Sequence, residues 1–483
     1  MGRGSARPGM QAGGGAIDPR AALTGAPGSD RTPVMKARLP AGTAVIAAGL
    51  LVAASAVLML LSTGIPPMDD TYIHLVYGAS LLTSDPVCFN EGQPSSGFTS
   101  PLWLPVAAMA SRALLAGPVL LMVFSLAAAA CAVLAPLPRS APLLVLTGPF
   151  LFHASSGMET ALACLLIALS WGRLSKREPS GLDGALLAAS GLCRPEFFLL
   201  MVPYTIRFIR RGRPLLPGAL SLLGPPVLAG SAWVAWNLHA TGSPLPASFY
   251  AKAGAPVSLG LLGLGLLKSS PLGFVLGMAA SVSMLRRGRL EGSIPLLLLA
   301  AALSTQPNPW FQMRYYVPVL FASGLACAAW LDGLGTPARR ILLPVILLTS
   351  LPGLLLYGRN RVLASRDVEA IDVRPALYIR DLADRSGNGT VICADAGAMK
   401  WLARVRVLDI DGLVTPPIPA GDLPWTADYA VLFPRQYAEV IEAAGPGLRP
   451  LTVFRSTSPV ICGEDAVEVF EVVRDSAQAG SSG

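Results

Sequence analysis

Residues 41–74 read AGTAVIAAGLLVAASAVLMLLSTGIPPMDDTYIH, an apolar run that ends shortly before a cluster of ionisable residues. The run 41–62 has 22 residues, which is enough to cross a bilayer as one helix. Asp69, Asp70 and His74 follow where this helix leaves the membrane. Charged groups so close to hydrocarbon are costly unless they bind or react with something. The acidic segment is therefore the first candidate site.

The composition is typical of a polytopic membrane protein. Hydrophobic residues make up 53% of the 483 positions and charged residues only 14%, with a mean hydropathy of +0.56. A soluble protein of this size needs more charge to cover its surface. Further apolar runs of spanning length predict a mainly α fold. We expect a transmembrane helical bundle of about nine spans plus one pair of half-length helices.

The net charge of +8 is explained by membrane topology rather than by nucleic-acid binding. Up to Tyr357 there are 24 Lys and Arg against 12 Asp and Glu, and from Gly358 onward there are 13 against 17. The positive excess lies in short loops between apolar runs, as the positive-inside rule expects. We therefore predict no nucleic-acid partner.

The same rule orients the chain and divides it into three parts. Residues 1–40 are rich in Gly, Ala, Pro and Arg, and are expected to be a disordered cytosolic tail before an uncleaved signal anchor. Asp69 and Asp70 then lie outside. The predicted transmembrane domain is 41–357. Its expected exterior loops are 63–100, 237–256 and 305–314, and residues 358–483 are expected to be extracytoplasmic.

Two apolar segments do not fit a simple count of spans. Residues 141–171 are too long for one span and too short for two, and break at 156–160. Residues 182–206 have basic clusters on both sides but are about one span long. We interpret this segment as two half-length helices that are broken at 193–196 and dip into the membrane and return. Such breaks are tolerated where protein or a cavity covers the backbone.

Residues 358–483 have the composition of a small α/β domain. Strands are predicted at 390–394, 405–410, 429–433, 451–454 and 467–473, and helices at 368–385, 396–402 and 436–444. The seven cysteines have no metal-ligand spacing, so no structural zinc is predicted. Cys393 and Cys462 lie outside, and the sequence leaves open whether they pair.

The adjacent carboxylates Asp69 and Asp70 raise each other's pKa unless a cation compensates. Either one stays ionised and acts as a general base, or both share a divalent ion such as Mg²⁺ or Mn²⁺. The simpler alternative is that one carboxylate caps the following helix and the other is solvated. An interfacial helix is expected over 70–82, and it places Asp70 and His74 on one face.

Two cations lie in the other expected exterior loops. Lys252 ends the polar and aromatic segment 246–252, which also contains Tyr250, and Arg314 stands at the mouth of a span. Both are placed to hold the phosphate of a lipid-linked donor. The alternative for either residue alone is snorkelling to the interface.

Three ionisable residues lie inside broken apolar segments. Arg194 and Glu196 occupy the break at 193–196, and Glu159 occupies the break at 156–160. An ion pair within the membrane indicates a functional site by default, and a structural clamp between half-helices is the alternative.

Eight short motifs occur in the chain at 69–73, 89–92, 97–103, 157–160, 194–196, 246–252, 314–316 and 394–398. With these motifs in this order, the chain resembles the bacterial GT-C membrane glycosyltransferases. It is most similar to the branch that includes mycobacterial cell-wall arabinofuranosyltransferases.

The resemblance implies an inverting sugar transfer from a polyprenyl-phosphate donor to an envelope glycan or lipid, on the outer face of the bacterial inner membrane. It implies that Asp69 is the general base and that Asp70 orients the acceptor or a metal ion. Lys252, Arg314 and His74 would balance the phosphate charge. Tyr72 and Tyr250 would line the sugar pocket, and the broken helices would admit the prenyl chain.

Two other functions fit parts of the pattern. A transporter or flippase of a lipid-linked or anionic substrate also uses broken helices and midplane charge. No repeat relates the two halves of this chain, however, and its charged motifs gather in exterior loops. A sensor needs fewer apolar segments than this chain has. Asp395, Asp409 and Asp411 either bind a ligand or metal in such an ectodomain or belong to turns at strand ends.

Overall fold

The computed structural model describes residues 42–135, 137–175, 181–210, 215–252, 258–305, 310–387, 389–416, 418 and 427–473. The predicted tail 1–40 lies outside these residues. Residues 40–483 form one compact unit.

Four helical segments among the described residues are long and apolar enough to cross a membrane. They are α1 (Gly42–Leu61), the segment Leu114–Leu134 that contains α4 (Gly117–Leu134), α10 (Leu215–Thr241), and the segment Thr336–Ser386 formed by α17 (Thr336–Val368) and α18 (Arg374–Ser386). A fifth span results if α12 (Leu259–Ser269) and α13 (Pro271–Arg286) are counted together, but these two helices are bent by 104°. The sequence predicts a single span there, returning to the basic cluster at Arg286. The chain is thus a membrane protein.

The other apolar helices are shorter than a full span. They are α3 (Leu104–Ser111), α7 (Thr160–Leu174), α8 (Leu182–Cys193), α14 (Ser293–Thr305) and α16 (Val317–Asp332). Within the described ranges, therefore, fewer helices of full length occur than the nine expected.

Small residues allow these helices to pack closely, as membrane helices do. A Cβ at Gly277 of α13 would lie 2.2 Å from the Ser323 carbonyl oxygen of α16. A Cβ at Gly184 of α8 would lie 2.3 Å from the Ser221 carbonyl oxygen of α10. Only glycine permits either contact.

Both predicted breaks are confirmed. The first apolar segment contains α5 (Ala141–Leu144), α6 (Gly148–Ala154) and α7, and Glu159 lies directly before α7. The second contains α8, a 3₁₀ segment (Pro195–Leu200) and α9 (Met201–Ile209). Arg194 at this break is extended, with φ −150° and ψ 127°, because proline at the next position disfavours the helical conformation. The dip into the membrane and back stays a prediction.

Helix α2 (Asp70–Ser80) is an internal helix rather than the expected interfacial one. Its residues from Thr71 to Gly78 are all buried. A Cβ at Gly78 would lie 2.5 Å from the Ala107 backbone, so α2 packs directly on α3. The short hairpin β1 (Cys88–Asn90) and β2 (Gln93–Pro94) follows. Helix α2 therefore carries its polar side chains into the interior.

The C-terminal region contains a mixed five-stranded sheet, and all five predicted strands are present. The strands are β3 (Thr390–Cys393), β4 (Arg406–Asp409), β5 (Tyr429–Leu432), β6 (Leu448–Arg455) and β7 (Ala466–Val472), in the order β4-β3-β5-β7-β6. Strands β4, β3 and β5 are parallel, and β7 and β6 are antiparallel to their neighbours.

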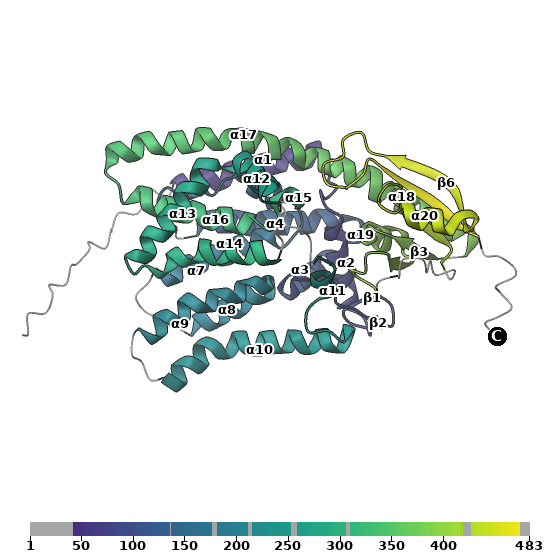
Figure 1. Cartoon of the computed structure of the whole chain (residues 1–483), viewed down its shortest axis with the longest axis horizontal. Coiled ribbons are helices and arrows are strands. Elements are labelled where there is room, and N and C mark those ends of the chain that lie inside the picture. Colours follow the sequence, from purple (N-terminus) through teal and green to yellow (C-terminus); the bar gives the residue numbers. More distant parts are fainter. Residues whose placement is uncertain are drawn as a thin grey trace, which may run out of the picture. The chain divides into compact units, whose positions relative to one another are not determined.

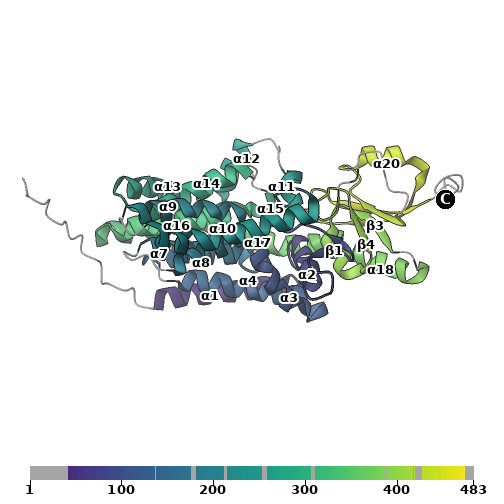
Figure 2. The same ribbon diagram turned by 90° about the horizontal axis from the view of Figure 1, so that it is seen from below.

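Three helices accompany the sheet, namely α18, α19 (Ala396–Ala398) and α20 (Ala438–Ala444). In the view of Figure 2, α18 and α20 lie on opposite sides of β3 and β4. Helix α17 continues through position 357, where the sequence suggests a domain boundary, and leads by a π-helical turn (Glu369–Val373) into α18 (Figure 1). Cys393 and Cys462 are both free.

Candidate active site at the carboxyl edge of the sheet

Asp69 binds backbone amides from the other end of the chain. Its Oδ2 accepts a hydrogen bond from the Gly397 N–H at 2.7 Å, and its Oδ1 accepts one from the Ala398 N–H at 2.6 Å. A Cβ at Gly397 would lie 2.6 Å from Asp69 Oδ2, so glycine is required for this contact. Asp69 stands at the N-cap of α2 but makes no capping bond with its side chain. The capping alternative is therefore wrong for Asp69.

A cavity of about 430 Å³ opens beside Asp69, and we call it the Asp69 cavity. Parallel strands place their carboxyl ends at one edge of a sheet, where ligands usually bind. Asp395 follows β3, Asp411 follows β4 and Phe433 follows β5, and all three line this cavity. The other lining residues are Met68, Asp69, Asp70, Phe311, Val368, Asp372, Ala394, Gln436, Ile461, Cys462 and Gly463.

The carboxyl groups in this cavity have a high affinity for protons. Burial raises the pKa of Asp69 well above its usual value, and the charge of Asp395 raises it further, whereas the amides of Gly397 and Ala398 lower it. Burial likewise raises the pKa of Asp395 to about 6. A carboxylate in this range is a stronger base than one in water.

Asp70 points to different partners. Its Oδ2 accepts a hydrogen bond from Arg314 Nη1, and its side chain is 34% exposed. Arg314 Nη2 lies 3.2 Å from Glu159 Oε1. Because Asp69 and Asp70 are engaged by separate groups, their side chains do not offer a ready joint chelate. A shared Mg²⁺ or Mn²⁺ ion stays a prediction that this geometry does not favour.

Glu159 is the centre of a buried ionic network. Its carboxylate lies 3.1 Å from Arg194 Nη2 and 3.5 Å from His74 Nε2, in addition to Arg314. Arg194 also contacts Glu196, at 3.0 Å. The structure thus brings together six residues that the sequence indicates, namely Asp70, His74, Glu159, Arg194, Glu196 and Arg314.

A second, small cavity of about 30 Å³ separates this network from α11 (Ala247–Lys252). Three of its lining residues carry buried polar atoms without a hydrogen-bond partner among the described residues: His74 Nδ1, Ser248 Oγ and Arg314 Nε. Unpaired buried polar atoms are costly. Ser248 Oγ and Arg314 Nε can donate to the oxygens of an anion, and His74 Nδ1 can do so when the imidazole is protonated.

A comparison with protein-family models finds no match, and neither does a comparison with curated protein sequences. Solved structures do match. ArnT from Cupriavidus metallidurans bound to undecaprenyl phosphate superposes with a TM-score of 0.57 at 14% identity, over 90% of this chain and 99% of that chain. The apo form of the same protein gives a TM-score of 0.53 at 15% identity, over 90% and 98%.

The chain shares its fold with ArnT. The predicted mainly helical membrane fold is thereby confirmed. The narrower likeness to arabinofuranosyltransferases is not tested by this result.

Arg314 follows a left-handed turn. Phe311, Gln312 and Met313 have φ values of 52°, 56° and 65°, which are unfavourable for residues with a side chain. The Gln312 side chain holds the turn, because its Nε2 donates to the Val460 carbonyl at 2.8 Å and its Oε1 accepts from Asn360 Nδ2 at 2.9 Å. This strained turn fixes where the Arg314 backbone enters the network.

Two of the expected site residues, Tyr72 and Tyr250, line neither the Asp69 cavity nor the small cavity. Tyr72 is 3% exposed and belongs to an apolar cluster with Leu75 and Trp103 rather than to a cavity wall. Tyr250 is 45% exposed on α11. Lys252 ends α11, and its side chain lies outside the described residues.

Sequence reasoning missed Asp372, Ser248 and the amides of Gly397 and Ala398. It noted the motif 394–398 but had no local signal that these amides would bind Asp69. It noted Cys462 only as a candidate for a disulfide. These groups meet the site through tertiary contacts, which no spacing in the sequence reveals.

Proposed function

We propose that the chain is a membrane glycosyltransferase of the GT-C type. It transfers a sugar from a polyprenyl-phosphate donor to an envelope glycan or lipid on the outer face of the bacterial inner membrane. Support comes from the fold shared with ArnT, whose structure contains undecaprenyl phosphate. The observation that carries the proposal is a partly buried carboxylate, Asp69, held by two amides on the wall of a cavity.

Asp69 is the general base of the proposed reaction. Each carboxylate oxygen has about two acceptor positions, so one position on each oxygen remains beside the amide bond. The acceptor hydroxyl gives its proton to Asp69 while its oxygen attacks the anomeric carbon. The bond from that carbon to the phosphate oxygen breaks, and the configuration inverts. The high pKa of Asp69 favours this proton transfer.

The leaving phosphate needs hydrogen-bond donors that stabilise its charge, and it does not need a general acid. Arg314 and Ser248 line the small cavity and carry hydrogen-bond donors without partners among the described residues, and His74 supplies a third donor when its imidazole is protonated. Lys252 lies on the same short helix as Ser248. Charge-assisted hydrogen bonds from such groups stabilise the growing phosphate charge. A cavity of about 30 Å³ is too small for a phosphate, so the side chains that line it have to move when the donor binds.

Asp69→Asn tests this proposal directly. The variant keeps the size of the side chain but loses the base, so we expect transfer to fall by about 10²- to 10⁴-fold with donor binding retained. Asp381→Asn, on the exposed side of α18, is the matched control. Unchanged turnover in Asp69→Asn would remove Asp69 as the base.

Two further measurements separate donor binding from chemistry. Charge reversal of Arg314 or Lys252 is expected to weaken binding of the polyprenyl-phosphate donor, and normal binding in both variants would exclude the phosphate site. Deletion of the gene followed by mass spectrometry should show accumulated lipid-linked sugar and a truncated envelope glycan. Wild-type protein and Asp381→Asn should restore the glycan, whereas Asp69→Asn should not.

A further inference from the structure

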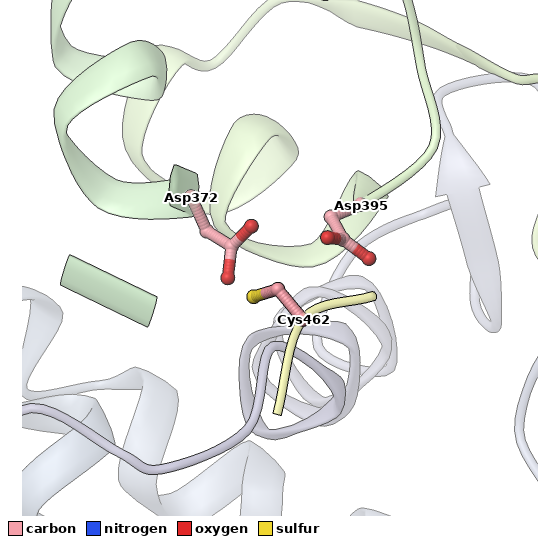
Figure 3. A group of neighbouring side chains, drawn as sticks. All are labelled: Asp372, Asp395 and Cys462. Atoms are coloured by element: carbon pink, nitrogen blue, oxygen red, sulfur yellow. The ribbon is translucent and has the colours of Figure 1, made fainter. Parts of the chain in front are cut away.

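Two carboxylates and a thiol from three distant segments meet on the wall of the Asp69 cavity. Asp372 lies in the π-helical turn after α17, Asp395 follows β3, and Cys462 lies in the loop between β6 and β7. One ligand atom from each residue lies within 4.8 Å of the other two. Figure 3 shows the three side chains converging on a common point.

Asp372 lacks the partners that a buried carboxylate requires. The residue is 4% exposed, and neither of its oxygens accepts a hydrogen bond from a described residue. Figure 3 shows its carboxylate directed towards Cys462 and Asp395. A buried acceptor without a partner is costly, and a buried charge is costlier. Its surroundings therefore require a positively charged ligand or a proton.

The charges around the cluster favour a cation. Asp69, Asp395 and Asp411 line the same cavity, and its described lining residues include no Lys, Arg or His. Asp411 is stabilised by the Tyr437 hydroxyl at 2.7 Å, and Asp69 by two amides. Asp372 has no amide or hydroxyl donor among the described residues, and the polar group beside it is a second carboxyl, that of Asp395. A divalent cation would compensate the excess negative charge.

The loop that carries Cys462 is held in place. Asp367 Oδ2, at the end of α17, accepts hydrogen bonds from the backbone N–H groups of Val460, Ile461 and Cys462 at 3.0, 3.1 and 3.1 Å. Gln312 binds the Val460 carbonyl from a different segment. The thiol is therefore positioned without a ligand, as preorganised metal sites require.

We propose that Asp372, Asp395 and Cys462 bind a divalent cation through two carboxylates and one thiolate. Sulfur favours Zn²⁺ over Mg²⁺ or Mn²⁺. Three protein ligands leave a fourth position open towards the cavity, as in catalytic zinc sites. Cys462 releases its proton to solvent when the ion binds. The site does not depend on the proposed sugar transfer.

Co²⁺ is the probe for this site, because a thiolate ligand gives a charge-transfer absorption band. Purified protein in detergent is treated with chelator and titrated with Co²⁺, then with Zn²⁺ as competitor. We expect one Co²⁺ per chain, a thiolate band and displacement by Zn²⁺. Cys462→Ser should lose the band and bind Zn²⁺ about tenfold or more weakly. Cys393→Ser, which removes the free thiol at the end of β3, should keep both the band and the Zn²⁺ affinity.

Three outcomes would overturn the proposal. The first is wild-type protein that binds neither ion. The second is a band that persists in Cys462→Ser or disappears in Cys393→Ser. The third is Asp372→Asn that raises thermal stability in the presence of chelator and leaves Zn²⁺ affinity unchanged, which would identify a carboxyl pair sharing a proton. Gel filtration of each variant establishes that it is folded.

Discussion

Arg314 lies 3.2 Å from the Glu159 carboxylate, although 155 positions separate the two residues in the chain. Their side chains are only 5% and 1% exposed. Glu159 also contacts Arg194 and His74. One carboxylate therefore compensates two buried guanidinium groups and fixes two broken segments relative to α2.

Glu159→Gln should destabilise the protein strongly. The substitution leaves Arg194 and Arg314 buried with less negative charge, and breaking a buried pair typically costs about 3–5 kcal/mol of unfolding free energy. Thermal unfolding in detergent measures the loss. Glu196→Gln is the control, because Glu196 is 19% exposed and, among the described residues, forms an ion pair with only one of the two arginines. Equal losses in the two variants would show that Glu159 is not the central counter-charge.

Gly397→Ala should displace the Asp69 carboxylate without unfolding the sheet. The added Cβ would lie 2.5 Å from the Asp69 carbonyl oxygen and 2.6 Å from Oδ2. A misplacement of about 1 Å costs roughly 100-fold in rate when a reacting group is involved. We expect kcat to fall, with donor affinity nearly unchanged.

The matched control for this variant is Gly389→Ala, also near β3. A Cβ at Gly389 meets only Val405, at 3.9 Å. Its activity should equal that of the wild type. If Gly397→Ala retains full kcat, the position of Asp69 does not determine the rate.

The sheet follows from sequence more completely than the membrane helices do. Strand residues such as Val391, Val407 and Val469 are fully buried, so their apolar runs between turn residues mark the strands clearly. Hydropathy, by contrast, does not show where a membrane helix bends. It predicts one span through Ser270, where the structure turns by 104° and only Pro271 at the start of α13 hints at the change.

The candidate site, too, was predictable from the sequence only in part. Helical spacing correctly places Asp70 and His74 on one face of α2, where both reach the Glu159 network. It says nothing of Asp69, whose partners come from α19, more than 320 positions away. The residues next to Asp372 and Cys462 in the sequence form no motif that indicates a binding site. The two side chains come close together only when α17 and the β6–β7 loop pack against each other in the folded protein.

Gln312→Ala should weaken the strained turn before Arg314. The three left-handed residues cost about 1–3 kcal/mol each, and the Gln312 side chain offsets part of this cost through Asn360 and Val460. We expect a lower thermal midpoint and faster proteolysis in this turn. Gln93→Ala, at an exposed position, should change neither. Equal proteolysis rates for the two variants would contradict this role of Gln312.

The protein should become less stable as pH rises from about 4 to 7, because the buried Asp409 carboxyl loses its proton over this range. Burial raises the pKa of its carboxyl from 3.8 to about 7, although the amides of Val414, Asp411 and Leu413 oppose the shift. The folded state thus binds the proton more tightly than the unfolded state. Stabilisation by this proton is fully present below pH 4 and is lost as pH rises through 7, and it amounts to at most roughly 4 kcal/mol. The measurement is the unfolding free energy as a function of pH, which should decrease between pH 4 and 7.

Asp409→Asn should flatten this decrease relative to the wild type. Glu442→Gln, at an exposed position on α20, should leave the decrease unchanged. A slope unchanged by Asp409→Asn would mean that Asp409 stays ionised among its amides.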